Sequence, residues 1–381
     1  MSRAQLERGL LEFVRALRPD TDPPLAVDPG TALFEDGVID SLRILDLIAF
    51  VEERTGSKIP DSAVRLENFR SVRAIVDAFG GHASGTGGAP EPIEPIRIFT
   101  RPSGRTGFTR PVESLIARHE LELVMPGGVR FRGRARQLLE FFDATAQGWA
   151  AEAGGGEETA PACLPREVLA RASCPAGLSA FGEALVPPAV CYHVYHAREG
   201  TRLDATPLVV SLRGRCLRDE ASLDLAGGRL REFEMREIVV LGSRDEVEQF
   251  RRRMIERVGD LMTALALEGR IETASDPFFL AGVDPETRAR RLMQQVLPLK
   301  LELRLPLDEL GPHCAVASFN HHLDFFGRRF SIRHASGATL HTGCVAFGME
   351  RWTLAFLAQH GTDEGAWPTP VREFLSSEVE A

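Results

Sequence analysis

The sequence LHTGCVAFGMERWTLAFLAQ, residues 340–359, predicts a strand that leads directly into a helix. Its first part, 341–347, is short and apolar, as is typical of a buried strand. In the second part apolar residues recur at helical spacing, so we expect a helix over 349–359. Gly348 stands at the junction, where a missing side chain lets a ligand approach the backbone, and Arg351 follows in the first helical turn. A guanidinium placed there can stack on a base or bind a phosphate, although an ordinary corner with a surface Arg is the commoner meaning of this pattern.

The composition, with 44% hydrophobic and 26% charged residues among 381, is that of soluble globular proteins. A net charge of −9 without a basic stripe does not favour a nucleic-acid partner. No apolar run approaches the roughly 18 residues of a membrane helix. The N-terminal segment is amphipathic and carries acidic residues, unlike a signal peptide, so we expect a cytoplasmic protein without a membrane partner. Its six scattered cysteines are expected to be reduced thiols, some of them available to a metal.

The first 80 residues have the pattern of about four helices. Apolar spacing predicts a first helix that ends before Pro19, a second that starts just after Ser41 and ends near Gly56, and a last one over 72–79. The segment LFEDGVIDSL places Asp40 and Ser41 directly before the second helix. This segment and the acidic helix that follows it resemble the acyl or peptidyl carrier protein family.

In that family the Ser of this motif carries 4′-phosphopantetheine, so the resemblance implies that Ser41 is the attachment site for a phosphopantetheinyl transferase. A phosphate at a helix N-terminus meets free N–H groups and the positive end of the helix dipole. The alternative is that Ser41 is only an N-cap, which is the role of most serines in such a position. The acidic residues of the second helix, Asp46, Glu52 and Glu53, suit docking on basic patches of partner enzymes.

Residues 81–97, rich in Gly, Ser and Pro, predict a flexible linker between this module (1–80) and a larger C-terminal domain (98–381). Such a tether gives an arm on the first module a high effective concentration at a site in the second. Reach alone leaves loading in cis and loading in trans both open.

The C-terminal domain mixes strand and helix patterns. From about residue 299 the sequence is strand-rich, through SFNHHLDFFGRRFSIR up to the opening stretch. Before that point we expect a helix over 135–149, a strand over 190–195 that carries Cys191, an antiparallel hairpin formed by 212–217 and 231–241, and a long helix over 245–267.

These pieces resemble the catalytic core of class II aminoacyl-tRNA synthetases. Arg218-Asp219-Glu220, a loop and REFEMRE look like the hairpin motif that binds ATP in that class. AFGMER looks like the strand–helix motif with its terminal Arg, with Ala346 in place of the usual first Gly. SFNHHLDFFGRRFSIR and HTGCVAFG are most similar to the seryl branch. The resemblance covers most of residues 185–360 and implies an α+β fold: a small four-helix carrier bundle joined to an antiparallel β-sheet flanked by helices.

The resemblance also implies roles for individual side chains. Arg218 would hold the α-phosphate of ATP, and Glu220 would bind the adenine amino group. Phe233 would stack on the adenine, and Arg351 would bracket its other face or the γ-phosphate. Magnesium would accompany the phosphates, but the acidic ligand expected just before SFN is not evident, and Cys314 lies near that place.

The chain lacks a coiled-coil arm for gripping tRNA and has a carrier-like module in its place, so no tRNA partner is expected. This combination resembles the amino acid:[carrier protein] ligases, relatives of an atypical, zinc-containing seryl-tRNA synthetase. These enzymes activate a small amino acid, here glycine or alanine by the resemblance, with ATP and pass it to a phosphopantetheine thiol. Class II cores usually dimerise, so we expect a homodimer. A genuine aminoacyl-tRNA synthetase and a non-catalytic scaffold are the alternatives.

In that group zinc is held by Cys, Glu and Cys and binds the substrate amine, which implies the ligands Cys191, Glu237 and Cys344, with Glu234 as the alternative carboxylate. We expect these elements to line one face of a single sheet. A lone cysteine is more often a small buried hydrophobe. The remaining cysteines are interpreted as structural, and two histidines within reach are interpreted as packing or surface residues: Cys163, Cys174, Cys216 and Cys314, and His321 and His322.

Overall fold

A computed structural model describes residues 2–16, 27–34, 38–39, 43–60, 63–81, 96–100, 107–172, 180–220, 222–274, 297–309 and 313–377. The chain divides into two compact units, Met1–Ile93 with Ala274–Leu299, and Glu94–Thr273 with Lys300–Ala381. Leu297, which lies in the predicted C-terminal domain, packs in the apolar core of the first unit. Most of the predicted linker lies outside the described residues.

The first unit packs its helices around an apolar core. Within each long helix, apolar residues three or four apart turn inward, as in Leu6, Leu10 and Val14. In the second helix Ile44, Leu47, Ile48 and Val51 are buried in the same way. The described helices are α1 (Arg3–Ala16), α2 (Ile44–Thr55), α3 (Leu66–Phe69) and α4 (Val72–Phe79).

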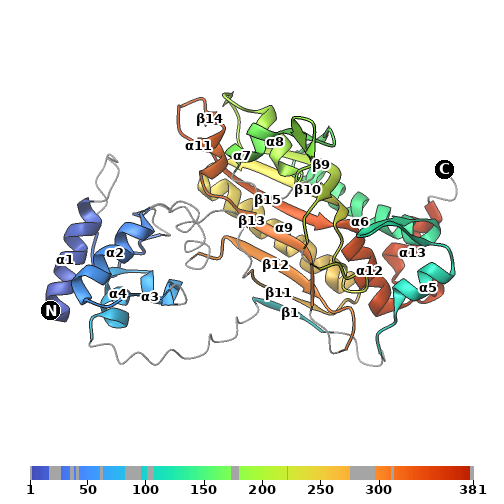
Figure 1. Ribbon diagram of the computed structural model, residues 1–381, viewed down its shortest axis with the longest axis horizontal. Helices are drawn as coiled ribbons and strands as arrows, with labels where there is room; N and C mark the ends of the chain where they lie inside the picture. Colours follow the sequence, from blue (N-terminus) through green and yellow to red (C-terminus); the bar gives the residue numbers. More distant parts are fainter. Residues whose placement is uncertain are drawn as a thin grey trace. The chain divides into compact units, whose positions relative to one another are not determined.

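The second unit is built on an eight-stranded sheet with the order β1-β11-β12-β13-β15-β10-β9-β4 (Figure 1). All neighbours are antiparallel except β4 and β9, which run parallel. The strands are β1 (Arg97–Phe99), β4 (Gly156–Thr159), β9 (Leu208–Leu217), β10 (Glu232–Gly242), β11 (Gly269–Thr273), β12 (Lys300–Leu305), β13 (Cys314–His321) and β15 (His341–Gly348).

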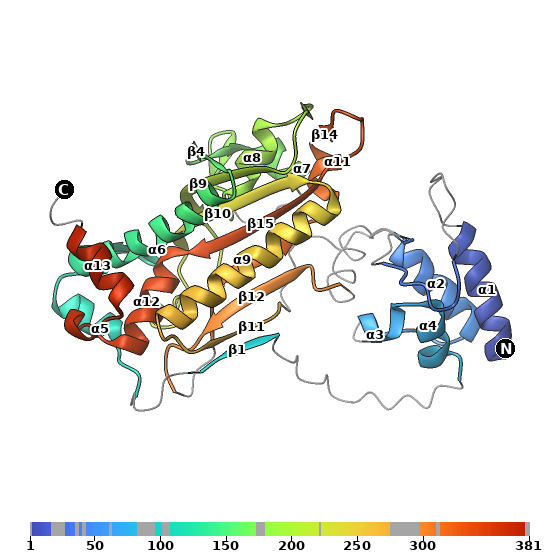
Figure 2. The same cartoon turned by 180° about the vertical axis from the view of Figure 1, so that it is seen from behind.

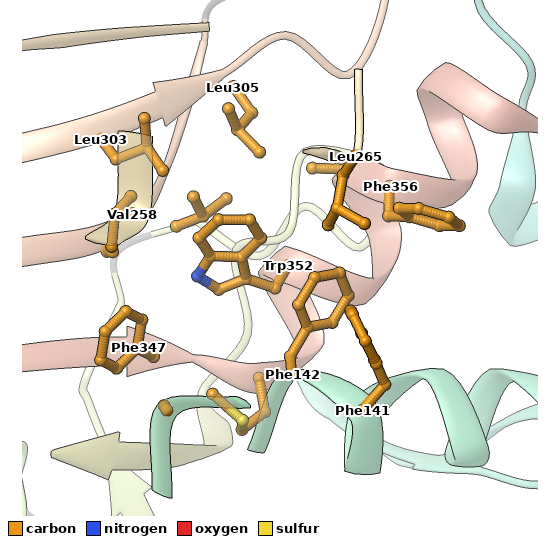
Figure 3. Packing of buried hydrophobic residues seen from close by; sticks show 14 of the residues in the cluster. Phe141, Phe142, Val258, Leu265, Leu303, Leu305, Phe347, Trp352 and Phe356 are labelled. Carbon is orange, nitrogen blue, oxygen red and sulfur yellow. The ribbon is translucent and has the colours of Figure 1, made fainter. Parts of the chain in front are cut away.

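Three long helices, α6 (Gly133–Glu152), α9 (Arg244–Ala264) and α12 (Met349–His360), share one apolar core with the sheet. Figure 2 shows α9 in front of the strands. Trp352 of α12 lies among Phe142, Leu265 and Leu303 in this core (Figure 3), and its ring centroid is 5.0 Å from that of Phe142. We call this side of the sheet the helical face and the opposite side the site face.

Alternation along the strands assigns side chains to these faces. On β10, Ile238 and Val240 belong to the core shared with the helices, so Met235 and Glu237 share the site face. On the neighbouring β15, Val345 and Phe347 belong to the same core, so Cys344 also projects to the site face. The hairpin β9–β10, the helix α9 and the strand–helix unit β15–α12 all agree with the sequence predictions.

Short elements complete the second unit. They are α5 (Pro111–Ala117), β2 (Leu121–Met125), β3 (Gly128–Phe131), β5 (Leu164–Pro165), α7 (Arg166–Arg171), β6 (Ala180–Phe181), β7 (Ala184–Leu185), α8 (Cys191–Ala197), β8 (Arg202–Leu203), α11 (Phe325–Arg329), β14 (Arg333–His334), the 3₁₀ turn η2 (Glu364–Ala366) and α13 (Thr369–Ser377).

Two of our predictions for this unit are wrong. Residues 190–195 were expected to be a strand, but Cys191 begins the helix α8. All five residues 191–195 are buried, and a short apolar run enclosed on every side has no alternation that separates helix from strand. The segment after β13 was expected to continue as strand, but Leu323 adopts a positive φ of 53° and the helix α11 follows it.

Candidate active site

Cys191, Glu237 and Cys344 converge from three separate elements. Their two sulfur atoms and a carboxylate oxygen all lie within 4.8 Å of one another, and all three residues are buried. Glu237 and Cys344 are close because β10 pairs with β15. Cys344 lies opposite Val239, which is the next residue after Glu237 on the same face of β10. The third comes from the start of α8, so the three elements do not belong to one sheet as we expected.

The three groups are buried acids whose pKa values are all raised above their ordinary values. Burial raises the pKa of Glu237. The hydrogen bond with Cys344, and then burial, raise the pKa of Cys191 well above its ordinary value. The hydrogen bond with Cys191 lowers the pKa of Cys344, but burial and the nearby carboxylate outweigh it, so the net shift is upward. A bound divalent cation would favour the ionised form of all three.

The carboxylate of Glu237 is oriented by only one of its oxygens. Oε1 accepts the backbone N–H of Val190 at 2.8 Å, which also fixes the start of α8 beside β10. Oε2 is buried and has no nitrogen or oxygen hydrogen-bond partner in the described part of the chain. Because buried polar atoms are rarely left without a partner, this orphaned oxygen fits the position of a metal ligand.

Glu234, the alternative carboxylate, points to the helical face. Its Oε2 accepts from Arg213 Nε at 3.1 Å, and its Oε1 lies 3.3 Å from Arg215 Nη2. Glu237 is three positions further along the strand, an odd number, so the two side chains leave β10 on opposite faces. The structure therefore presents Glu237, not Glu234, to the two sulfur atoms.

Two polar side chains, Asn320 of β13 and His322 directly after that strand, lie beside Cys344. Asn320, which pairs with Cys344 across the sheet, donates from Nδ2 to Sγ at 3.2 Å. His322 places Nε2 3.8 Å from the same sulfur. His321 points to the helical face, where its Nδ1 lies 3.5 Å from Glu248 of α9. Asn320 was missed by the sequence analysis, because only the pairing of β13 with β15 brings it beside the sulfur.

Three of the residues expected to bind ATP lie at one end of β9 and β10. Arg218 directly follows β9, and its backbone N–H bonds to Arg231 O at the start of the partner strand. Its guanidinium carbon is 5.0 Å from the ring centroid of Phe233. Glu220 lies two residues further along, with Oε2 3.8 Å from Arg229 Nη1. The basic, aromatic and acidic groups of the predicted site are thus neighbours in space.

Arg351 joins the loop between β9 and β10 to β13. Its Nε donates to Gly228 O at 2.9 Å, and its Nη1 donates to Ala315 O at 3.0 Å. Gly228 has a φ of 69°, and a Cβ there would lie 3.2 Å from Arg351 Cγ and 3.3 Å from Cys314 Sγ. Glycine is therefore required for the loop to lie this close to Arg351, and Cys314 occupies the neighbouring space.

The remaining cysteines and Ser41 lie away from this cluster or outside the described residues. Cys163, Cys216 and Cys314 are free thiols and do not belong to the metal-ligand cluster. Cys174 and Ser41, the predicted phosphopantetheine attachment site, lie outside the described residues. Among the described residues, no helix has both the length and the apolar character needed to cross a membrane.

Comparisons with known proteins place this geometry in a family context. No family model matches the chain. It is 40% identical over 194 residues to amino acid--[acyl-carrier-protein] ligase 1 of Bradyrhizobium diazoefficiens, covering 51% of this chain and 58% of the relative. It is 34% identical over 199 residues to the type-2 serine--tRNA ligase of Methanothermobacter thermautotrophicus, covering 51% and 37%. The chain therefore spans less than two thirds of the length of either relative.

Two solved structures are similar over most of the chain. M. kandleri SerRS, in a crystal structure with A. aeolicus tRNASec, has a TM-score of 0.63 at 21% identity, covering 82% of this chain and 69% of that one. The second unit has the seryl-tRNA synthetase fold. The Pyrococcus horikoshii seryl-tRNA synthetase complexed with ATP has a TM-score of 0.62 at 15% identity, covering 98% and 87%. The α+β, mostly antiparallel core of a class II synthetase predicted from the sequence is thereby confirmed.

Of the residues predicted to bind ATP, Arg218 lies on the same side of the sheet as the metal-ligand cluster. Arg218 contacts Met235, whose sulfur is 3.9 Å from Nη2, and Met235 alternates with Glu237 on the site face. The positive charge of Arg218 also opposes the rise in the pKa of Glu237. An anionic nucleotide held at Arg218 would therefore lie near the three buried acids.

Proposed function

We propose that this protein activates a small amino acid with ATP, as the aminoacyl-adenylate, and transfers it to the phosphopantetheine thiol of a carrier protein domain. The convergence of Cys191, Glu237 and Cys344 beside a hairpin that carries Arg218 supports this proposal most directly. The printed name of the ligase relative, amino acid--[acyl-carrier-protein] ligase, agrees with it.

Zinc fits the donor set. Two thiolates and one carboxylate with an orphaned oxygen form a three-ligand set of the kind that leaves a fourth position open. Bound zinc would act as a Lewis acid and bind the substrate amine at this open position. The buried Cys191, Glu237 and Cys344 exclude water from it, so an α-amino acid of small size is selected by its free amine.

In the first step the amino acid carboxylate attacks the α-phosphorus of ATP. A new P–O bond forms, the bond to the β-phosphate oxygen breaks, and pyrophosphate leaves with its magnesium. Arg218 binds the α-phosphate and stabilises its developing negative charge. Arg351 contacts the other face of the adenine or the γ-phosphate. Phe233 stacks on the adenine, and Glu220 accepts a hydrogen bond from its amino group. Glycine and alanine are the amino acids proposed.

In the second step the thiol sulfur attacks the carbonyl carbon of the adenylate. A thioester forms, the bond to the AMP oxygen breaks, and the thiol proton is lost to solvent. No protein nucleophile is needed. We assign the thiol to phosphopantetheine on Ser41, in the same chain or in a second one, and assign residues 1–80 as the carrier. The helical first unit and its exposed Asp46 on α2 support that assignment.

Intact-mass analysis tests the whole proposal. The phosphopantetheinylated chain is incubated with ATP and each proteinogenic amino acid in turn. We expect one small amino acid to add its residue mass through a hydroxylamine-labile bond. Ser41→Ala should abolish the gain, while the matched exposed control Ser57→Ala should retain it. If pyrophosphate exchange depends on the amino acid but the chain gains no mass, residues 1–80 are not the carrier. If there is no exchange at all, the protein is a non-catalytic scaffold.

A genuine tRNA synthetase is the competing function, because the type-2 serine--tRNA ligase relative is 34% identical. Aminoacylation of tRNA with serine would establish it. We expect none, together with a homodimeric mass in solution.

A further inference from the structure

We propose that His322 is a positioning residue, which holds the sulfur of Cys344 in place for a metal. Tyr195 and Thr342 in turn fix the imidazole. This inference rests on the metal site of the proposed function. It assigns a positioning role to three residues that are not metal ligands.

The imidazole of His322 bridges the metal-ligand cluster and two buried hydroxyl groups. Its Nε2 lies 3.8 Å from Cys344 Sγ. On the opposite side of the ring, Nδ1 lies 3.3 Å from the hydroxyl of Tyr195 and 3.3 Å from the hydroxyl of Thr342. Tyr195 and Thr342 are fully buried, and Cys344 and His322 are nearly so, at 3% and 8% exposed.

The hydrogens can be assigned from these partners. A metal-bound Cys344 is a thiolate, which only accepts hydrogen bonds. The imidazole must then carry its hydrogen on Nε2 and donate it to the sulfur. Nδ1 becomes the acceptor, and the hydroxyl groups of Tyr195 and Thr342 that face it both have a hydrogen to donate. The thiolate thus sets the tautomer, and either hydroxyl can donate its hydrogen to the single lone pair of Nδ1.

Packing holds the ring in this orientation. The ring of His322 meets Phe326 edge-on at 5.0 Å, and Phe326 stacks on Tyr195 at 4.2 Å. The backbone N–H of His322 donates to Thr342 O at 2.8 Å, which continues the pairing of β13 with β15. Leu323 then turns the chain with a positive φ of 53°, so the strand pairing ends directly after His322.

Outer partners of this kind orient metal ligands and strengthen binding, and their loss typically lowers metal affinity about 10- to 100-fold. The test uses full-length chain with Zn²⁺ alone, titrated in competition with a chromophoric chelator. Co²⁺ then replaces Zn²⁺, and the sulfur-to-metal charge-transfer band is recorded as a readout independent of activity. The variants are His322→Phe, His322→Gln, Tyr195→Phe and the matched control His321→Phe, which changes the neighbouring imidazole on the helical face.

We expect His322→Phe to weaken zinc binding about 10- to 100-fold and to move the cobalt band to lower energy, because the sulfur loses a donor. His322→Gln, whose amide places an N–H near the former Nε2, should recover most of the affinity. Tyr195→Phe keeps the stacked ring and should weaken binding in the same direction but less. His321→Phe should leave both readouts unchanged.

Equal affinity and an unshifted band in His322→Phe would overturn the inference while leaving the proposed function intact. So would an equal loss in His321→Phe, because the effect would then not be specific to the sulfur-facing ring. If His322→Phe does not fold, Tyr195→Phe decides, and unchanged affinity there also overturns it. A wild-type chain that binds no Zn²⁺ removes the proposed metal site itself, and this inference with it.

Discussion

Glu350 should make the second unit less stable as the pH rises from about 4.5 to about 7. It is the second residue of α12 and only 3% exposed. Both of its carboxylate oxygens lie 3.0 Å from the backbone nitrogen of Glu234, which donates to them. Burial, the largest cause, raises the pKa of Glu350 to about 7. Ionisation of Glu350 near neutral pH therefore destabilises the folded state.

The sign and size follow from proton linkage. Between an unfolded pKa of 4.5 and a folded pKa of about 7, the folded state binds more protons, so the free energy of unfolding falls as the pH rises. The contribution is fully present below 4.5 and is lost above 7. At 1.36 kcal/mol for each pKa unit, the loss is about 3 kcal/mol.

Urea unfolding followed by tryptophan fluorescence reports on the second unit, which contains Glu350. All three tryptophans, Trp149, Trp352 and Trp367, belong to that unit. Wild type and Glu350→Gln are compared from pH 4.5 to pH 8. The amide keeps an oxygen to accept the N–H of Glu234 but cannot ionise. Taking the difference between the two proteins cancels every other titrating group.

The variant should gain stability relative to wild type by about 3 kcal/mol across this range, with most of the change between pH 5 and pH 7. A difference that stays constant with pH would show that Glu350 titrates alike in the folded and unfolded chains. The argument from burial would then be wrong.

Three further predictions concern the site and the core. Glu237→Gln should reduce bound zinc, measured by mass spectrometry of the metal, by at least about tenfold, whereas Glu234→Gln should retain the metal, since that side chain faces Arg213. Arg351→Lys should lower amino-acid-dependent pyrophosphate exchange by about 10²-fold, because one ammonium cannot replace the fork that contacts two carbonyls; unchanged exchange would exclude a role in catalysis. Trp352→Ala should cost about 3–5 kcal/mol of unfolding free energy in urea, and a loss below about 1 kcal/mol would mean the core refills the cavity.

Much of the candidate site could be read from local pattern. The residues of each motif, such as Arg218 with Phe233, are close in sequence, and a hairpin brings them together without help from the rest of the fold. Strand alternation separates Glu234 from Glu237 once the hairpin is known. The partners of Cys344 could not be read in this way, because Asn320 is 24 residues distant and becomes its neighbour only through strand pairing.

The sequence by itself determined the strand–helix unit β15–α12, the hairpin β9–β10 and the long helix α9, because each depends on periodicity within one continuous segment. Only the tertiary structure decided that Cys191 begins a helix, because enclosure by neighbours removed the periodicity that distinguishes the two states. It also decided that Glu350 is buried and that His322 faces a sulfur atom. These outcomes depend on which strands lie beside which, and that order is set by burial of the whole sheet rather than by any single stretch of it.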